Sequence, residues 1–385
     1  MNQIRLDDID DIARGAAILG TGGGGDPYLG KLLAARALEE HGPVTMVDVD
    51  EVPDDALVVP VGMMGAPTVI VEKPPAGDEF GKALTGIERA VGRRVTHIAC
   101  MEAGGINSMT PIVTSATTGL PLIDGDGMGR AFPELQMVLP TLDDIATTPM
   151  AMADDKGNVV VLDTVDNLWA ERLGRVATTE MGSSSCIALY PMTGKQARDA
   201  LVPATLTLAA RLGRLVARSR REHRSAADAL VDEMGGAVLF TGKVVDVARR
   251  TTGGFVRGEA ELSGIGADSD STLRLSFQNE HLVAERDGRI VTSVPDLICV
   301  LDAETGEPVT TEAMRYGFRV VVVGLPCYRR WRTPEGLALV GPGYFGYDHE
   351  YAPVEELTRG LARAARGRVD DGPSRSEGRE TPEHV

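Results

Sequence analysis

The sequence predicts an α/β fold in which a mostly parallel sheet with helices is followed by a β-rich second domain. In the first half of the 385-residue chain, short apolar runs typical of buried strands alternate with amphipathic segments typical of helices. From Ala237 onward the pattern changes to short β-rich runs separated by turns. The length also favours two domains over one.

The alternation in the first half can be followed segment by segment. Helices are expected where apolar residues recur at helical spacing, and strands where short apolar runs are bounded by turns. The expected helices cover 7–19, 28–40, 78–91, 107–118 and 165–179, and the expected strands cover 44–49, 57–61, 68–71, 95–101, 120–123 and 158–164, with a loop at 63–67. Strands that alternate with helices in this way imply a largely parallel sheet.

The second half begins with a helical stretch, 195–218, which is interrupted near Pro203. The strands expected after it cover 239–248, 255–262, 272–277, 281–285, 290–293, 297–301 and 318–323. We assign residues 1–166 to the N-terminal α/β domain and 167–360 to the C-terminal β-rich domain. Residues 366–385 are rich in Gly, Ser, Pro and charged residues and offer few apolar side chains to bury, so we expect a disordered tail.

The charge and cysteine content narrow the function classes. A net charge of −17 argues against nucleic acid and anionic membranes as partners, because both would repel the chain. The four cysteines are far apart and form no CxxC pair, so they do not indicate a disulfide framework or a structural zinc site. The acidic N-terminus lacks the features of a signal peptide, and no run of about 18 apolar residues exists. We therefore expect a cytoplasmic protein, and we expect it to be a homo-oligomer.

A glycine-rich loop follows the first expected helix. Gly20, Gly22 and Gly25 match GxGxxG, and Asp48 lies beyond them at a strand end, as in a dinucleotide fingerprint. The preceding segment is helical, however, and an aspartate stands where phosphate would sit. Three interpretations stay open: nucleotide binding, a close approach or tight turn that needs glycine, and a loop that contacts a small uncharged ligand through Gly23 and Gly24.

Two acidic loops follow two expected strands. Glu102 directly follows the strand 95–101, and Asp124 directly follows the strand 120–123. Since ligands sit at the carboxyl ends of parallel strands, neighbouring strands would bring both acids to one crevice. Gly104 and Gly105 would leave backbone N–H groups open for an oxyanion, and the helix starting at Asn107 would add its positive end.

The second loop carries Asp124 and Asp126, separated by a glycine. That spacing suits two carboxylates that hold a hard cation or share a proton, so a divalent metal ion is the one cofactor the pattern suggests. Arg130 would compensate their charge or hold a substrate carbonyl. The competing interpretation is that Asp-Gly pairs are turn residues and that Glu102 caps a helix or pairs with Arg130.

Two further features of the sequence bear on these acids. Cys100 is interpreted as core, because a neighbouring carboxylate would raise the pKa of its thiol and weaken it as a nucleophile. The stretch Gln278-Asn279-Glu280-His281 in the second domain is polar enough to face a cleft.

Several motifs together resemble the S-methyl thiohydantoin desulfurase family, formerly domain of unknown function 917. The resemblance covers about residues 5 to 360 and implies two domains, Rossmann-like and then mostly β. It also implies a small-ring substrate and an association with hydantoinase or oxoprolinase-type proteins. The matching segments are 19–27, 64–67, 102–108, 124–134, 251–255, 278–280, 295–298 and 340–342.

The resemblance implies a hydrolase that converts an S-methyl thiohydantoin to a hydantoin and releases methanethiol. That reaction needs a base for water, an acid for the ring nitrogen or the sulfur, and donors for the ring carbonyls. We expect Glu102 to be the base. Asp124 or Asp126 would be the acid, or would hold a metal ion that activates water. Asn107, Arg130 and the Gly104–Gly105 amides would orient the ring.

Two other functions stay open. One is a non-catalytic ligand- or nucleotide-binding partner of a hydantoinase or oxoprolinase-type enzyme, which the glycine loop favours. The other is a metal-dependent cyclic amidase that opens the ring.

Overall fold

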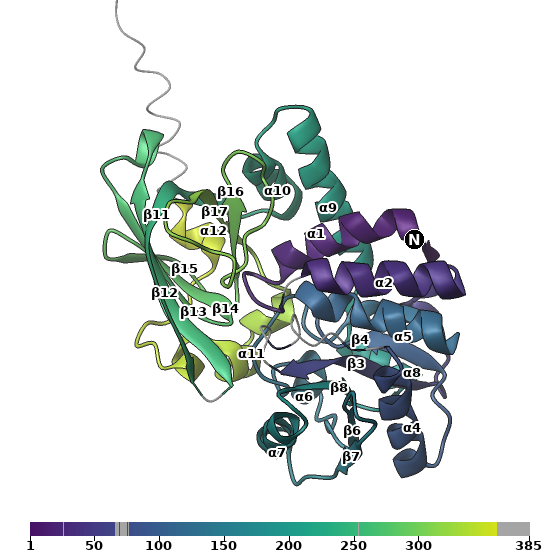
Figure 1. Cartoon of the computed structure of the whole chain (residues 1–385). Helices are drawn as coiled ribbons and strands as arrows, with labels where there is room; N and C mark the ends of the chain where they lie inside the picture. The colour runs from purple at the N-terminus through teal and green to yellow at the C-terminus, as the bar shows by residue number, and fades with distance from the viewer. Residues whose placement is uncertain (26, 66–68, 70–74, 76, 253, 360–385) are drawn as a thin grey trace, which may run out of the picture.

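The computed structural model describes residues 1–25, 27–65, 69, 75, 77–252 and 254–359. Within them the chain forms an α/β part on one sheet and a β-rich part on a second sheet (Figure 1). The predicted fold class is therefore confirmed. Apart from residue 69, the expected strand at 68–71 lies outside the described residues, and so does the expected tail at 366–385.

The first sheet has a parallel centre. Its strands are β1 (Gln3–Ile4), β2 (Val44–Asp48), β3 (Leu57–Gly65), β4 (His97–Cys100), β5 (Leu122–Asp126), β6 (Met150–Ala153), β7 (Val159–Leu162), β8 (Ser184–Ala188), β9 (Met192–Thr193) and β10 (Val202–Pro203). The central strands run parallel in the order β2, β5, β4, β3. β8, β6 and β7 then extend the sheet in antiparallel pairs. Because β3 is buried on both faces, it reads as a continuous apolar run in the sequence, whereas β2 alternates buried and exposed residues.

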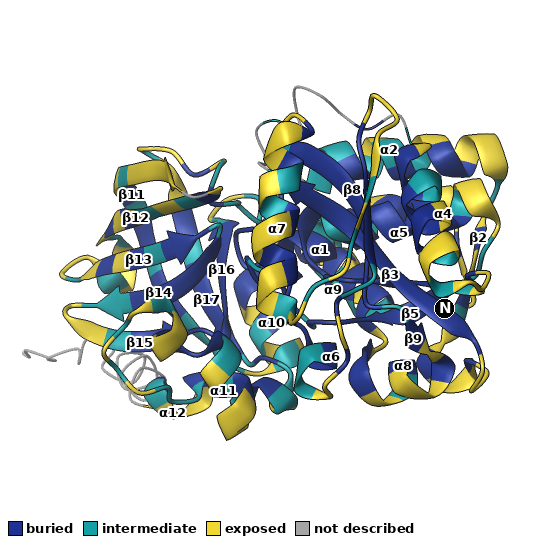
Figure 2. Cartoon of the chain, turned by 90° about the horizontal axis from the view of Figure 1, so that it is seen from below, coloured by how far each residue is buried: buried dark blue, intermediate teal, exposed yellow. Residues whose placement is uncertain are grey.

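Helices cover both faces of this sheet (Figure 2). The helices of this part are α1 (Ile9–Leu19), α2 (Pro27–His41), α4 (Glu79–Val91), α5 (Thr110–Thr118), α6 (Leu139–Leu142), α7 (Asn167–Glu180), α8 (Gly194–Ala200) and α9 (Thr205–Arg221). The next helix, α10 (Ala226–Met234), packs on α9 and on the β-rich part. α4 and α7 lie on opposite faces of β6, since Gly86 of α4 meets Ala151 and Gly174 of α7 meets Met150.

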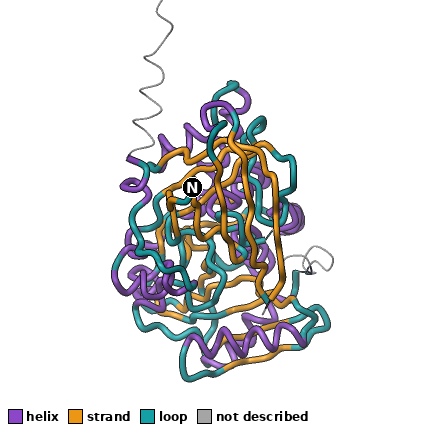
Figure 3. The backbone as a smooth tube through the Cα atoms, turned by 90° about the vertical axis from the view of Figure 1, so that its left-hand side faces the viewer, coloured by secondary structure: helices purple, strands orange, loops and turns teal. Residues whose placement is uncertain are grey.

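The second sheet is antiparallel, and its strands run side by side in Figure 3. They are β11 (Ala237–Thr252), β12 (Phe255–Gly264), β13 (Thr272–Gln278), β14 (Glu280–Arg286), β15 (Arg289–Ser293), β16 (Leu297–Asp302) and β17 (Arg319–Leu325). Their order is β15, β14, β13, β12, β11, β17, β16. The short helices α11 (Pro334–Val340) and α12 (Val354–Leu357) follow.

β16 shows how the two parts are joined. Leu297, Cys299 and Leu301 belong to the large apolar core that continues into the α/β part. Ile298 and Val300 point the other way, into a smaller core inside the β-rich part. Alternate side chains of one strand thus bury two faces, so the two parts share a core.

The structure corrects several expected boundaries. β3 continues to Gly65, so the loop expected at 63–67 begins as strand. β5 extends through Asp126, so Asp124 lies within the strand and does not follow it. β6, β8 and α10 were not predicted. The β6 and β8 strands are four and five residues long, and strands that short give little periodic signal.

The first sheet does not end at residue 166. β8 pairs with β3, and β10 pairs with β5, so residues well beyond 166 complete the first sheet. The β-rich sheet itself begins at Ala237. The division of the chain into domains at 166 and 167 stays a prediction. None of the helices in the described part of the chain combines the length and apolarity needed to cross a bilayer.

Candidate functional site

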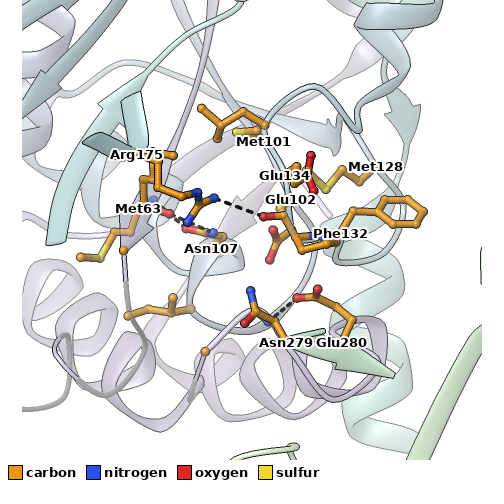
Figure 4. A pocket seen from close by; sticks show the side chains of 17 residues that line it. Met63, Met101, Glu102, Asn107, Met128, Phe132, Glu134, Arg175, Asn279 and Glu280 are labelled. Atoms are coloured by element: carbon orange, nitrogen blue, oxygen red, sulfur yellow. Dashed lines mark hydrogen bonds between the residues drawn. The ribbon is translucent and has the colours of Figure 1, made fainter. Parts of the chain in front are cut away.

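A pocket lies where the carboxyl end of β4 meets the β-rich part (Figure 4). Glu102 follows this strand by two residues and is 7% exposed, so its predicted place at the strand end is where the structure puts it. The pocket is open to solvent, and the space between its walls and at its mouth is about 650 Å³ in total. The lining residues are Gly24, Gly25, Met63, Met64, Gly65, Met101, Glu102, Ile106, Asn107, Met128, Phe132, Pro133, Glu134, Leu135, Arg175, Asn279 and Glu280.

A second carboxyl group, Glu280, enters this pocket from the β-rich part. It is the first residue of β14 and is 2% exposed. Asn279 before it has a left-handed backbone (φ 57°), and its Oδ1 accepts the Val256 N–H at 2.9 Å. This turn aims Glu280 at the α/β part. The sequence analysis marked the 278–281 stretch as cleft-facing but did not assign Glu280 to the site.

The glycine loop lies between the two carboxyl groups. The Gly24 N–H donates to Glu280 Oε1 at 3.2 Å. A Cβ on Gly23 would lie 2.1 Å from Glu280 Oε1, and one on Gly24 would lie 2.8 Å from Glu102 Oε1. The glycines therefore allow a close approach of the two parts. The loop follows a helix, and a carboxylate takes an amide that a nucleotide phosphate would need, so the geometry does not fit a dinucleotide fingerprint.

Some of the glycines predicted to bind substrate, and the side chain of Asn107, line the pocket, and the other glycines do not. Gly24 and Asn107 line the pocket. Gly23, Gly104 and Gly105 do not line it and instead pack loop against loop: a Cβ on Gly105 would lie 2.1 Å from the Gly24 carbonyl oxygen. Asn107 holds the pocket wall, because its Oδ1 accepts the Met63 N–H at 2.7 Å.

Burial sets the electrostatics of the carboxyl pair. Burial, with the Glu280 and Asp126 carboxylates beside it, raises the pKa of Glu102 well above its usual range. Burial also raises the pKa of Glu280 to about 8, which the Arg130 guanidinium only partly offsets. Within the described residues, Glu102 Oε1 and Glu280 Oε2 have no hydrogen-bond partner. The pair can thus hold protons near neutral pH and present free oxygens to a ligand.

Asp126 lies beneath this site and does not line the pocket. Its carboxylate accepts the N–H groups of Ala103 at 2.8 Å, Met128 at 3.0 Å and Gly129 at 2.9 Å. Burial raises the pKa of Asp126 to about 7, although these hydrogen bonds act in the opposite direction. Asp126 therefore fixes the backbone that carries Glu102 and acts on Glu102 through its charge.

Asp124 turns away to a different partner. Its Oδ1 accepts the N–H groups of Leu206 at 3.0 Å and Thr207 at 3.1 Å, and its Oδ2 accepts the Thr207 hydroxyl at 2.5 Å. It thus caps the start of α9 from outside that helix. The predicted convergence of Asp124 and Asp126 on one cation is not what these contacts show. No group of three or more His, Cys, Asp or Glu that could hold a metal occurs in the described ranges.

Arg130 is completely buried behind the pocket and does not line it. Its Nη1 donates to the carbonyls of Pro295 at 2.7 Å and Asp296 at 2.9 Å, and its guanidinium lies 4.5 Å from the Phe132 ring centroid. Its Nη2 has no hydrogen-bond partner among the described residues. The predicted role in holding a substrate carbonyl is replaced by contacts that join the two parts.

Arg175 of α7 is a pocket residue that the sequence analysis missed. It binds Glu171 through Nε, donates from Nη2 to the Pro133 carbonyl at 3.4 Å, and stacks 4.1 Å from the Phe255 ring centroid. Its guanidinium points into the pocket (Figure 4). The only available signal was the 251–255 motif, because Gly254 and Phe255 of that motif pack on Arg175.

Comparison with known proteins gives both a family match and a fold match. A family described as S-Me-THD-like, N-terminal domain, matches residues 7–164, and one described as S-Me-THD-like, C-terminal domain, matches residues 165–354. A crystal structure of a protein from Chromobacterium violaceum shares the fold, with a TM-score of 0.75 and 24% identity over 92% of this chain and 100% of that chain. No protein with a curated description matches the chain.

Proposed function

This chain belongs to the S-Me-THD-like family, and on that premise we propose that it is a hydrolase of a small five-membered nitrogen heterocycle. The expected reaction converts an S-methyl thiohydantoin and water to a hydantoin and methanethiol. One observation carries the proposal: two buried carboxyl groups, Glu102 and Glu280, enter one pocket from the two parts of the chain.

The chemistry needs two proton-transfer groups. The carbon bonded to sulfur accepts water, which must lose a proton to a base as the C–O bond forms. The ring nitrogen must then gain a proton, and the departing thiolate needs another. Two carboxyl groups of raised pKa, one ionised and one protonated, can supply both functions near neutral pH, as paired carboxyl groups do in other hydrolases.

The walls suit a small uncharged ring that carries a methylthio group. Met63, Met64, Met101, Met128 and Phe132 give an apolar, polarisable lining. Such side chains pack well against a thioether sulfur and its methyl group.

Arg175 is the donor that we assign to a ring carbonyl, since it is the one Lys or Arg among the described lining residues. Glu171 and Phe255 hold its guanidinium, so little side-chain entropy is lost when it binds a substrate oxygen. The ion pair with Glu171 leaves the pocket without a free positive charge, which fits an uncharged substrate better than an anionic one.

The test is turnover of S-methyl thiohydantoin by the full chain in H₂¹⁸O. We expect methanethiol by gas chromatography and a hydantoin that carries one ¹⁸O at the carbon that lost sulfur. Glu102→Gln and Glu280→Gln should each lower kcat by about 100-fold or more. Gly81→Ala is the matched control with full turnover, because a Cβ there meets nothing within 4 Å.

Other outcomes would identify the alternatives. A ring-opened product without thiol release would identify a cyclic amidase. Stabilisation by ATP or NAD, with neither binding nor turnover of ring compounds, would identify a non-catalytic binding partner.

A further inference from the structure

We propose that the two carboxyl groups have fixed and different tasks: Glu280 is the base that takes the proton of water, Glu102 is the acid, and Arg130 is the positioning residue that sets this order. The inference rests on the proposed hydrolase function and reverses the expectation that Glu102 is the base. It stands on the neighbours that each carboxyl group has.

The surroundings of Glu280 favour its ionised form more than those of Glu102 do. The Gly24 N–H donates to Oε1, and the positive charge of the buried Arg130 is the strongest effect that opposes the pKa rise caused by burial. Although burial lowers the pKa of Arg130 to about 10, Arg130 stays charged at neutral pH, and Glu280 is the anion that acts on it most strongly. Glu312 is the acid that opposes this effect on Glu280.

The surroundings of Glu102 favour its protonated form. Asp126 lies beneath it and accepts three backbone N–H groups, which favour the charged form of Asp126. Asp126 and an ionised Glu280 both repel a charge on Glu102. The Asn107 amide and Arg130 act to lower the pKa of Glu102, but their effects are smaller than those of burial and the two carboxylates, which raise it.

Backbone contacts fix this asymmetry in the fold. Arg130 Nη1 donates to the carbonyls of Pro295 and Asp296 at 2.7 and 2.9 Å, so its guanidinium is held in place. Three N–H groups hold Asp126 next to Ala103. The two groups that act on the carboxyl pair are therefore both positioned by the backbone.

The proton transfers then balance in two steps. In the first, Glu280 carboxylate takes a proton from water as oxygen bonds to the carbon that bears sulfur. The C=N electron pair moves to nitrogen, which takes the proton of Glu102. In the second, the new hydroxyl returns its proton to Glu102, the C–S bond breaks, and the thiolate takes the proton of Glu280. Both groups end in their starting state.

A stronger nucleophile distinguishes base from acid. Hydroxylamine attacks carbon with less help from a base than water needs, so it can replace water where the base is missing. We expect hydroxylamine to raise thiol release from the S-methyl compound by about 10-fold or more in Glu280→Gln and by less than about 2-fold in Glu102→Gln. The reverse pattern would overturn the assignment.

The role of Arg130 is tested by the pH profile of kcat/KM. Arg130→Met should move the ascending limb to higher pH by about one unit or more, because Glu280 loses its neighbouring positive charge, and Arg130→Lys should restore much of it. Arg332→Met is the matched control, because Arg332 binds Asp296 of the same segment at 2.7 Å. Equal shifts in Arg130→Met and Arg332→Met would show a merely structural role and refute the positioning role.

A measurement without substrate separates the inference from the proposed function. The δ-¹³C resonances of Glu102 and Glu280, assigned by the two Gln variants, should show Glu280 ionising first, with Arg130→Met delaying it. If no thiol is released from the S-methyl compound but this order holds, the proposed function fails and the order stands. Ionisation of Glu102 first would refute the order whatever the activity.

Discussion

Replacing Glu280 by glutamine should stabilise the protein near neutral pH while it removes activity. In the unfolded chain the Glu280 carboxyl group ionises with its ordinary pKa of 4.5, whereas burial raises the pKa of Glu280 in the folded protein to about 8. Between these values the unfolded state releases a proton that the folded state keeps. Stability therefore falls as pH rises through this window, and glutamine removes that loss.

The size of the effect follows from the two pKa values. At pH 7 the protonated group in the fold corresponds to about 3 kcal/mol of lost stability relative to an ionised, hydrated glutamate. At pH 5 the same relation gives less than about 1 kcal/mol. Glutamine has nearly the same shape, and its side-chain carbonyl can accept the Gly24 N–H that Glu280 accepts. The advantage of the variant should thus grow by about 2 kcal/mol from pH 5 to pH 7.

Urea unfolding at pH 5, 6 and 7 measures this difference. Trp331 is fully buried and its indole N–H donates to the Met128 carbonyl at 2.7 Å, so its fluorescence reports loss of the contact between the two parts. Glu335→Gln, at an exposed position in α11, is the control for the loss of a charge. If the wild type and Glu280→Gln keep a constant difference across the three pH values, the reasoning about Glu280 is refuted.

Three further predictions test other parts of the site. Gly23→Ala should lower kcat by about 10-fold or more and lower the free energy of unfolding by about 1–3 kcal/mol, because its Cβ would displace the Glu280 carboxyl group. Turnover equal to that of Gly81→Ala would contradict this. Asp124→Ala should lower the free energy of unfolding, measured with urea, by about 2 kcal/mol or more, since it removes the cap of α9. The kcat and KM of the folded variant should be unchanged. A selective loss of kcat would show that Asp124 takes part in catalysis. Iodoacetamide at pH 7.5 should not inactivate the native protein, because all four cysteines are buried and burial raises the pKa of each thiol. Inactivation that accompanies alkylation of Cys100 would instead indicate that this thiol takes part in the reaction.

Local patterns in the sequence were sufficient for the fold class and for one wall of the site. The apolar run of β4 followed by Glu102 marks a strand end, and the parallel pairing of β4 with β5 is as expected. The seven strands of the β-rich part were all predicted, because alternation and turn residues are local signals. The motifs also led to the family that the two halves of the chain match.

The two acidic loops show where local patterns stop being informative. Asp124 and Asp126 look alike in sequence, yet one caps a helix 82 residues later and the other holds the Glu102 backbone. A carboxylate that satisfies backbone N–H groups and one that faces a substrate have the same residue type and the same glycine neighbours. Only the distant partner distinguishes them.

The sequence by itself determined the α/β fold class, the seven strands of the β-rich part and the place of Glu102 at a strand end. The tertiary structure decided that Glu280, 256 residues beyond Gly24, completes the site. It also decided that Arg130 and Asp126 give the two carboxyl groups different surroundings. The physical reason is that desolvation and charge act through space: the pKa of a buried carboxyl group depends on which groups the fold brings beside it, however far apart they lie along the chain.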